Sequence, residues 1–173
     1  MNIKIRKANA ADAAILALLA RISFEQAFGC VWDKDVLKNY LSKTFCVQKM
    51  KQSIEKENNI FWIAFADELP VGYAKLKKYS PYEKLHDPRP AQLQKIYLLT
   101  DFTRIGIGEK MQDALFNEVA LNGIETLWLA VWDKNDKAVQ FYERHGFEKT
   151  TTYHYDYEKM SFDYFVMTKE FRA

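Results

Sequence analysis

An α/β domain built on one mixed sheet is the fold class that the sequence predicts. Segments with the two-residue alternation of strands are interleaved with segments whose apolar residues have helical spacing. Their order is strand, helix, helix, strand, strand, strand, helix, strand, helix, strand, strand, which is typical of helices packed on a sheet. A length of 173 residues suits one core. We therefore expect a single domain over residues 1–173.

The first third of the chain carries one strand, two helices and a polar segment that fits a third helix. Alternation over residues 3–7 predicts the opening strand. A helix follows a cap at Asn9 or Asp12, with one apolar face made of Ile15, Leu18, Leu19 and Ile22. A second helix begins at Asp33 or Asp35, and its apolar side holds Val36, Leu37, Tyr40 and Leu41. A third, polar helix fits residues 47–57.

Strands dominate the middle and the end of the chain. Residues 60–66 and 71–77 predict a hairpin, and residues 80–90, with three of the four prolines, predict a long loop. A strand over 93–99 precedes a helix over 106–122 that Gly123 ends. A buried strand over 124–132, a helix over 135–145 and two strands over 147–157 and 162–171 complete the chain.

Composition excludes several classes of protein. The 25 Lys and Arg residues nearly balance 23 Asp and Glu, so no basic field favours nucleic acid. The longest apolar run, residues 13–20, is too short to span a membrane, and we expect a cytoplasmic protein. His86, His145 and His154 lack metal-ligand spacing, so no metal is expected, and Cys30 and Cys46 suit two buried free thiols.

A strand, a turn with two glycines and a helix follow one another around Gly106 and Gly108. Such a turn directs unpaired backbone N–H groups and the positive end of the helix dipole at one point, which suits a pyrophosphate. Arg104 can add a charge. A plain strand-to-helix turn is the alternative. A dinucleotide fingerprint would need a third glycine where Met111 stands, which disfavours a nicotinamide or flavin enzyme.

A second motif follows the buried strand and supports the first. It comprises Asn135, Ala138, Phe141, Tyr142, Gly146 and Phe147. Together with the glycine turn, it resembles the GNAT superfamily of acyl-CoA-dependent N-acyltransferases, over nearly the whole chain. Residues 61–66, 94–98 and 128–138 are similar to the PaiA-type polyamine N-acetyltransferases. The resemblance implies a mostly antiparallel sheet, flanked by helices, with a splayed central pair of parallel strands.

The resemblance also implies where acetyl-CoA binds. The pantetheine arm would pair with backbone groups of the strand before the glycine turn, at Ile96, Tyr97, Leu98 and Leu99. The pyrophosphate would lie against the backbone of Thr103, Arg104, Ile105, Gly106, Ile107, Gly108 and Glu109. Asn135 would hydrogen-bond the pantetheine amide, and Ala138 would keep that helix face low enough for the ligand to pass.

Three residues are expected to act in catalysis. The N–H of Leu98 would stabilise the oxyanion of the tetrahedral intermediate. Tyr142 resembles the family tyrosine that protonates the departing thiolate, although a buried core tyrosine tethered by its hydroxyl would look the same in sequence. Gln94 stands where relatives often have a glutamate, and Thr103 replaces the family's Gln or Arg.

The sequence does not determine which group removes the proton from the amine. An alkylammonium with a pKa of about 10.4 is only about 0.1% neutral at about pH 7.4, so some route must remove its proton. Water held by Gln94 and Tyr97 is one route, and a carboxylate such as Glu83 or Glu25 is another. Glu83 and Asp87 also fit ordinary solvated loop charges.

The leading function is direct transfer of the acetyl group of acetyl-CoA to a primary amine. A small polyamine such as spermidine or spermine is the first acceptor, and a peptide or protein amine is the second. A non-catalytic acyl-CoA-binding module is the alternative, motivated by Gln94 and Thr103. Two alternatives fit the aromatic strands near residues 153–157 and 162–165. They form the interface of a homodimer, or they are core strands covered within the domain, and the sequence is the same in both cases.

Overall fold

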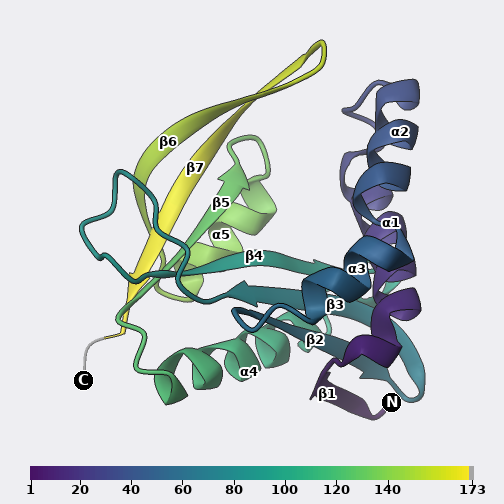
Figure 1. Cartoon of the computed structure of the whole chain (residues 1–173), viewed down its shortest axis with the longest axis horizontal. Helices are drawn as coiled ribbons and strands as arrows, with labels where there is room; N and C mark the ends of the chain where they lie inside the picture. The colour runs from purple at the N-terminus through teal and green to yellow at the C-terminus, as the bar shows by residue number, and fades with distance from the viewer. Residues whose placement is uncertain (172–173) are drawn as a thin grey trace. The chain divides into compact units, whose positions relative to one another are not determined.

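A computed structural model describes residues 1–171 and contains one mixed sheet flanked by helices (Figure 1). The strand order is β1-β2-β3-β4-β5-β7-β6. The strands are β1 Ile3–Lys7, β2 Asn59–Ala66, β3 Leu69–Lys77, β4 Ala91–Leu98, β5 Thr126–Trp132, β6 Glu148–Tyr157 and β7 Met160–Glu170. The α-helices are α1 Ala13–Phe28, α2 Lys34–Thr44, α3 Val47–Ile54, α4 Ile107–Leu121 and α5 Asp136–Arg144. The predicted α/β class is confirmed.

The chain forms two compact units, which we describe separately. The first unit consists of Met1–Leu76 and Lys95–Asn117, and the second of Lys77–Gln94 and Glu118–Ala173. In sequence, β4 and α4 each contribute to both units. The candidate site residues are accordingly reported unit by unit.

In the first unit, a short 3-10 helix, η1 (Ala10–Asp12), joins β1 to α1. Asn9 forms a capping box with Asp12, as the predicted cap required. Asp12 is 6% exposed and accepts two hydrogen bonds from Arg6 of β1, at 2.7 and 2.8 Å. The hydrogen bonds from Arg6 hold the pKa of the Asp12 carboxyl below its ordinary value. This ion pair therefore holds the start of α1 next to β1.

The predicted apolar face of α1 is right for Leu19, which is buried, and wrong for Leu18 and Ile22. Leu18 is 59% exposed and Ile22 is 37% exposed, whereas Leu16 and Phe24 are buried. The ring of Phe24 lies 5.4 Å from that of Trp32, and also contacts Tyr40 of α2 and Phe45. These aromatic contacts, which come from residues outside the helix, set its rotation.

The second unit contains the end of the sheet that carries β5, β7 and β6. β5 pairs with β7 in antiparallel register from Thr126↔Glu170 to Trp132↔Tyr164. Its parallel pairing with β4 covers only Ala91↔Leu127 and Gln92↔Trp128. Beyond Trp128, backbone groups on this edge of β5 are not engaged by β4. The expected pair of parallel strands is therefore present, but the pairing of β4 with β5 ends at Gln92 and Trp128.

The cysteines are both free, but they are less buried than expected. Cys30 is exposed and Cys46 is partly exposed. Cys30 lies in the turn between α1 and α2, where Val31 is also exposed.

Across residues 1–171, no helix is long and apolar enough to cross a membrane. Nor do the described side chains gather three or more His, Cys, Asp or Glu residues around a possible metal ion.

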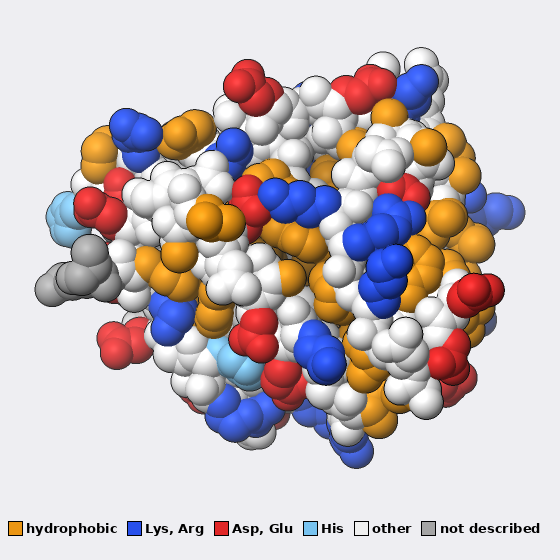
Figure 2. Space-filling view, turned by 90° about the horizontal axis from the view of Figure 1, so that it is seen from below, with side chains coloured by type: hydrophobic (Ala, Val, Ile, Leu, Met, Phe, Trp, Pro, Cys, Tyr) orange, Lys and Arg blue, Asp and Glu red, His pale blue; other side chains and the backbone are white. Residues whose placement is uncertain are grey.

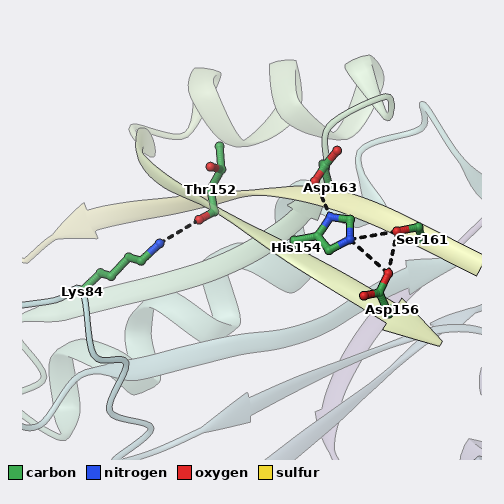
Figure 3. A network of polar contacts seen from close by, with 6 residues as sticks. All are labelled: Lys84, Thr152, His154, Asp156, Ser161 and Asp163. Atoms are coloured by element: carbon green, nitrogen blue, oxygen red, sulfur yellow. Dashed lines mark hydrogen bonds and ion pairs between the residues drawn. The ribbon is translucent and has the colours of Figure 1, made fainter.

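β6 and β7 form a hairpin whose exposed face carries a polar network (Figure 3). His154 lies between two carboxylates, with Nδ1 2.7 Å from Asp163 and Nε2 3.0 Å from Asp156. The Ser161 hydroxyl donates to Asp156 and also lies 2.8 Å from His154 Nε2. The hydrogen bond to Asp163, together with the charge of Asp156, raises the pKa of His154.

This network predicts a pH-dependent contribution of His154 to stability. The raised pKa means that the contribution is complete below the ordinary histidine pKa of about 6.5 and disappears as pH rises through the folded-state value. We expect His154→Gln to lower the Tm slightly at about pH 5.5 and to leave it unchanged at about pH 9. Thermal unfolding at both pH values tests this. An equal loss of Tm at both would contradict an ionic origin.

Candidate active site

In the first unit, the glycine turn between β4 and α4 has the backbone of an anion site. A 3-10 helix, η2 (Thr100–Phe102), is followed by left-handed φ angles at Arg104 (63°) and Gly106 (82°). Ile107 then begins α4, so the N–H groups of its first turn lack helical partners. Lys110 makes the first such bond, to the Gly106 carbonyl at 3.3 Å. These free donors fit a pyrophosphate.

Thr103, which departs from the family pattern, closes this turn. Its hydroxyl donates to the carbonyl of Thr100 at 2.8 Å, and its own N–H donates to the same carbonyl at 3.2 Å. The Thr103 side chain is therefore used within the turn. Arg104 is exposed, and it is the basic side chain within residues 103–109. Backbone donors and Arg104 thus remain for the phosphates.

Gly72 of β3 allows the close approach of Leu98 in β4, a feature that the sequence analysis missed. A Cβ atom at Gly72 would lie 2.4 Å from Leu98 Cδ2 and 2.6 Å from the Tyr97 carbonyl oxygen. The next residue of the turn, Leu99, donates its N–H to Val71 at 2.8 Å. A glycine in a strand interior was the available signal, since it often marks a close backbone approach.

In the second unit, Asn135 begins α5 as its N-cap. Its side-chain oxygen accepts the N–H of Ala138 at 3.3 Å. From the family resemblance, Asn135 was expected only to bind the pantetheine arm. The structure adds a capping role, which occupies the oxygen and leaves the side-chain NH₂ group to donate to a ligand.

Tyr142 of α5 carries a phenol suited to proton donation. Its ring lies 5.5 Å from Phe141 and 5.6 Å from Phe147, and burial raises the pKa of its hydroxyl. The phenol is therefore neutral and retains its proton at ordinary pH. Within the described residues, this hydroxyl has no hydrogen-bond partner, so Tyr142 differs from a core tyrosine tethered by its hydroxyl.

Also in the second unit, Ser80, Gln92 and Gln94 form a connected polar group, which we call the amide row. The Gln94 Nε2 and the Ser80 hydroxyl both donate to Gln92 Oε1, each at 3.1 Å. Ser80 is 5% exposed, and its carbonyl accepts the indole N–H of Trp128 at 2.8 Å. The sequence pattern singled out Gln94 but neither its partner Gln92, two residues before it, nor Ser80, which lies 12 residues before Gln92.

The loop of residues 78–90 is anchored beside this row. The Tyr82 ring stacks on the Trp128 indole at a centroid distance of 5.1 Å and an angle of 25°. Lys84 reaches the hairpin and donates from Nζ to the Thr152 carbonyl at 3.2 Å, as Figure 3 shows. These two contacts tie the predicted long loop to strands β5 and β6.

The predicted site residues therefore fall into two groups. The first unit brings together the β4 end and the turn, with Ile96, Tyr97, Leu98, Leu99, Thr103, Arg104, Ile105, Gly106, Ile107, Gly108 and Glu109. The second unit holds Gln94, Asn135, Ala138 and Tyr142. Both carboxylates suggested as bases, Glu83 and Glu25, are exposed in their own units.

A strand–turn–helix segment with free N–H donors, a parallel strand pair with a short ladder and a partly buried phenol are the features expected of an acyl-CoA-dependent acyltransferase. Comparison with known families agrees, because the model of the acetyltransferase (GNAT) family matches residues 23–147. The chain belongs to the GNAT family. It is an acetyl-CoA-dependent N-acetyltransferase, with acetyl-CoA as its co-substrate.

Of two similar proteins, one has a name that gives no acceptor and the other has a name that gives an alanine. An uncharacterised N-acetyltransferase of Lactobacillus delbrueckii subsp. lactis is 25% identical over 145 residues, which cover 84% of each chain. A ribosomal protein bS18-alanine N-acetyltransferase of Escherichia coli K12 is 36% identical over 61 residues, covering 35% of this chain and 41% of its own.

Solved structures share the whole fold. The PaiA N-acetyltransferase of Thermoplasma acidophilum, in complex with coenzyme A, has a TM-score of 0.79 at 23% identity. The match covers 99% of this chain and all of that one. A ribosomal-protein-alanine N-acetyltransferase of Brucella melitensis has a TM-score of 0.76 at 20% identity, with 97% and 99% covered. At these identities the likeness concerns the fold.

Proposed function

We propose that the chain acts as one N-acetyltransferase domain that transfers the acetyl group of acetyl-CoA directly to a primary amine. The observation that carries the proposal is Tyr142, a neutral and partly buried phenol without a hydrogen-bond partner in the described chain, on the helix that Asn135 caps. No cysteine belongs to the proposed site, so no acyl-enzyme is formed.

Contacts with acetyl-CoA follow from the backbone of each unit. The N–H groups at the start of α4, with those of residues 104–106, bind the pyrophosphate, and Arg104 adds a charge. The backbone of residues 96–99 hydrogen-bonds the pantetheine arm. The NH₂ group of Asn135 donates to a pantetheine carbonyl, and the small side chain of Ala138 leaves room beside it.

Transfer then needs three chemical tasks. The amine nitrogen attacks the thioester carbonyl carbon, and the N–H of Leu98 stabilises the oxyanion that forms. The carbon–sulfur bond breaks while Tyr142 gives its proton to sulfur. Gln94 contacts the amine. The proton released by nitrogen returns to Tyr142 through water, so the site regains its starting state.

Two classes of acceptor remain, each with its own support. Residues 61–66, 94–98 and 128–138 resemble the PaiA-type polyamine N-acetyltransferases, and this similarity favours a polyamine. The chain also shares its fold with PaiA. A peptide or protein α-amine is favoured by the sequence match to alanine N-acetyltransferases. On the face shown in Figure 2, basic and acidic side chains are interspersed, and no acidic field that would collect a polycation stands out.

A thiol-release assay tests the proposed function. Acetyl-CoA is mixed with the protein and a panel of amines that includes spermidine, spermine and short peptides, and a thiol reagent follows free coenzyme A. Release that depends on an amine, with a matching acetylated product by mass, supports direct transfer. Binding of acetyl-CoA without release across the panel would instead favour a non-catalytic acyl-CoA-binding module.

A further inference from the structure

We propose that a pocket in the second unit binds a free amino acid with a basic side chain. Its cavity volume is about 270 Å³, close to the lower end of the range of about 300–1,000 Å³ for small-molecule sites. Its polar walls come from the loop before β4 and from the connection between α4 and β5. They are formed by Tyr79, Asp87, Arg89, Asn122, Gly123 and Glu125, and we call this site the loop pocket. These residues do not overlap with the predicted acetyl-CoA residues, so the inference does not rest on the proposed function.

The guanidinium of Arg89 provides a site for a carboxylate. It lies 5.1 Å from the centre of the Tyr79 ring, and Nη2 lies 3.4 Å from the Tyr79 hydroxyl. Within residues 1–171, Arg89 forms no ion pair. Stacking on the ring holds the plane of the guanidinium, and its other N–H groups stay available. A planar guanidinium binds a carboxylate through two parallel hydrogen bonds, so the ligand group that suits Arg89 is a carboxylate.

The backbone around this pair holds it in place before any ligand binds. Asp87 Oδ1 accepts the N–H of Arg89 at 2.7 Å, which fixes the turn that carries both residues. Tyr79 has a left-handed φ of 53°, which is rare for a bulky side chain. The next residue, Ser80, donates its N–H to the Pro90 carbonyl at 2.7 Å and closes the loop. Such left-handed residues cluster at ligand-binding sites, where the surrounding structure maintains them.

Acceptors for amino groups lie on the opposite wall. The backbone carbonyl of Glu125 accepts the N–H of Phe171 at 2.7 Å, whereas the Glu125 carboxylate has no partner in the described part of the chain. Asn122 donates from Nδ2 to the carbonyl and the carboxylate of Glu118, at 2.8 and 3.1 Å, so its Oδ1 remains an acceptor. At Gly123, an added Cβ atom would meet no atom within 4 Å, so this wall leaves room for a ligand.

The charges of the loop pocket decide the class of ligand. One guanidinium, from Arg89, lines the pocket together with the two carboxylates of Asp87 and Glu125, and no ion pair among the described residues joins them. A ligand with one carboxylate and two ammonium groups complements all three charges. Lysine has this set near neutral pH, since an α-amine has a pKa of about 7.8 and an ε-amine one of about 10.4. A diamine lacks the carboxylate for Arg89, and a neutral amino acid lacks the second ammonium group.

The test measures dissociation constants by calorimetric titration of the full chain without acetyl-CoA, so that no acetyl transfer occurs. The probes are L-lysine, cadaverine, which is lysine without the carboxylate, and L-norleucine, which lacks the ε-ammonium group. We expect L-lysine to bind about tenfold or more tightly than either of the others, because each lacks one charged contact. Equal Kd values for L-lysine and cadaverine, or no binding of L-lysine at high millimolar concentration, would overturn the inference.

Two variants assign the contacts. Arg89→Gln should weaken L-lysine about tenfold or more and should not weaken cadaverine, because cadaverine has no group for the guanidinium. Glu125→Gln should weaken both L-lysine and cadaverine. Arg144→Gln is the matched control, since Arg144 is an exposed arginine of α5 outside the pocket, and it should leave every Kd unchanged.

A third variant separates the loop pocket from the proposed active site. Tyr142→Phe should leave the Kd of L-lysine unchanged, because Tyr142 does not line the loop pocket. A weaker Kd in Tyr142→Phe together with an unchanged Kd in Arg89→Gln would place L-lysine at the active site and overturn the inference. The thiol-release assay tests the proposed function independently of this result.

Discussion

Replacing Tyr142 by phenylalanine is expected to lower kcat by about 100- to 10,000-fold, the usual contribution of a general acid. The phenol is neutral because burial raises its pKa, and it is the proton donor that the proposed mechanism gives to sulfur. The ring contacts with Phe141 and Phe147 remain in the variant. Acetyl-CoA affinity should therefore change little, as calorimetric titration would show.

A second tyrosine provides the control for this variant. Tyr155 of the hairpin stacks on Tyr157 and has no assigned part in transfer. Tyr155→Phe removes one phenol from the same unit, and kcat should stay within about twofold. If Tyr142→Phe retained full turnover, the proton would reach sulfur by another route and Tyr142 would lose its catalytic assignment.

Gly72→Ala is expected to damage both stability and transfer. The added methyl group would overlap the Tyr97 carbonyl oxygen and the Leu98 side chain, so β3 or β4 must shift. Overpacking of this kind costs about 1–3 kcal/mol. A displacement of Leu98 would also misplace its N–H, and errors approaching 1 Å can cost about 100-fold in rate. Urea denaturation and kcat measure the two effects.

A double variant separates the two contacts of this methyl group. Leu98→Ala removes Cδ2 but leaves the Tyr97 carbonyl 2.6 Å from the new Cβ. Compared with Leu98→Ala alone, Gly72→Ala should therefore still lower the free energy of unfolding, by less than in the native background. An unchanged urea midpoint and unchanged kcat in Gly72→Ala would show that the sheet accommodates the methyl group.

Much of the fold could be predicted because local signals agree with the final structure. Asn9, Asp33 and Asn135 cap helices where the sequence places helix starts. Alternation located the seven strands within a few residues. The rotation of α1 could not be predicted, since it is set by Trp32, Tyr40 and Phe45, which lie outside that helix.

The candidate site was predicted where its residues are contiguous and missed where they are not. The turn from Thr103 to Glu109 and the Asn135 to Tyr142 motif are local, and their spacing in sequence is enough to propose roles. Ser80 and Gln92 meet only because the loop folds back against the start of β4. Gly72 matters through its neighbour in the next strand, and strand register cannot be obtained from a single sequence.

Lys84 has a consequence for how the protein behaves in solution. β6 is the last strand of its sheet, so one row of its backbone groups faces outward. Such a row invites strands of other molecules to add to it, and a lysine is a common obstacle to that growth. By placing its ammonium group on the Thr152 carbonyl, Lys84 brings a positive charge to the last strand, where we expect it to oppose the addition of a further strand.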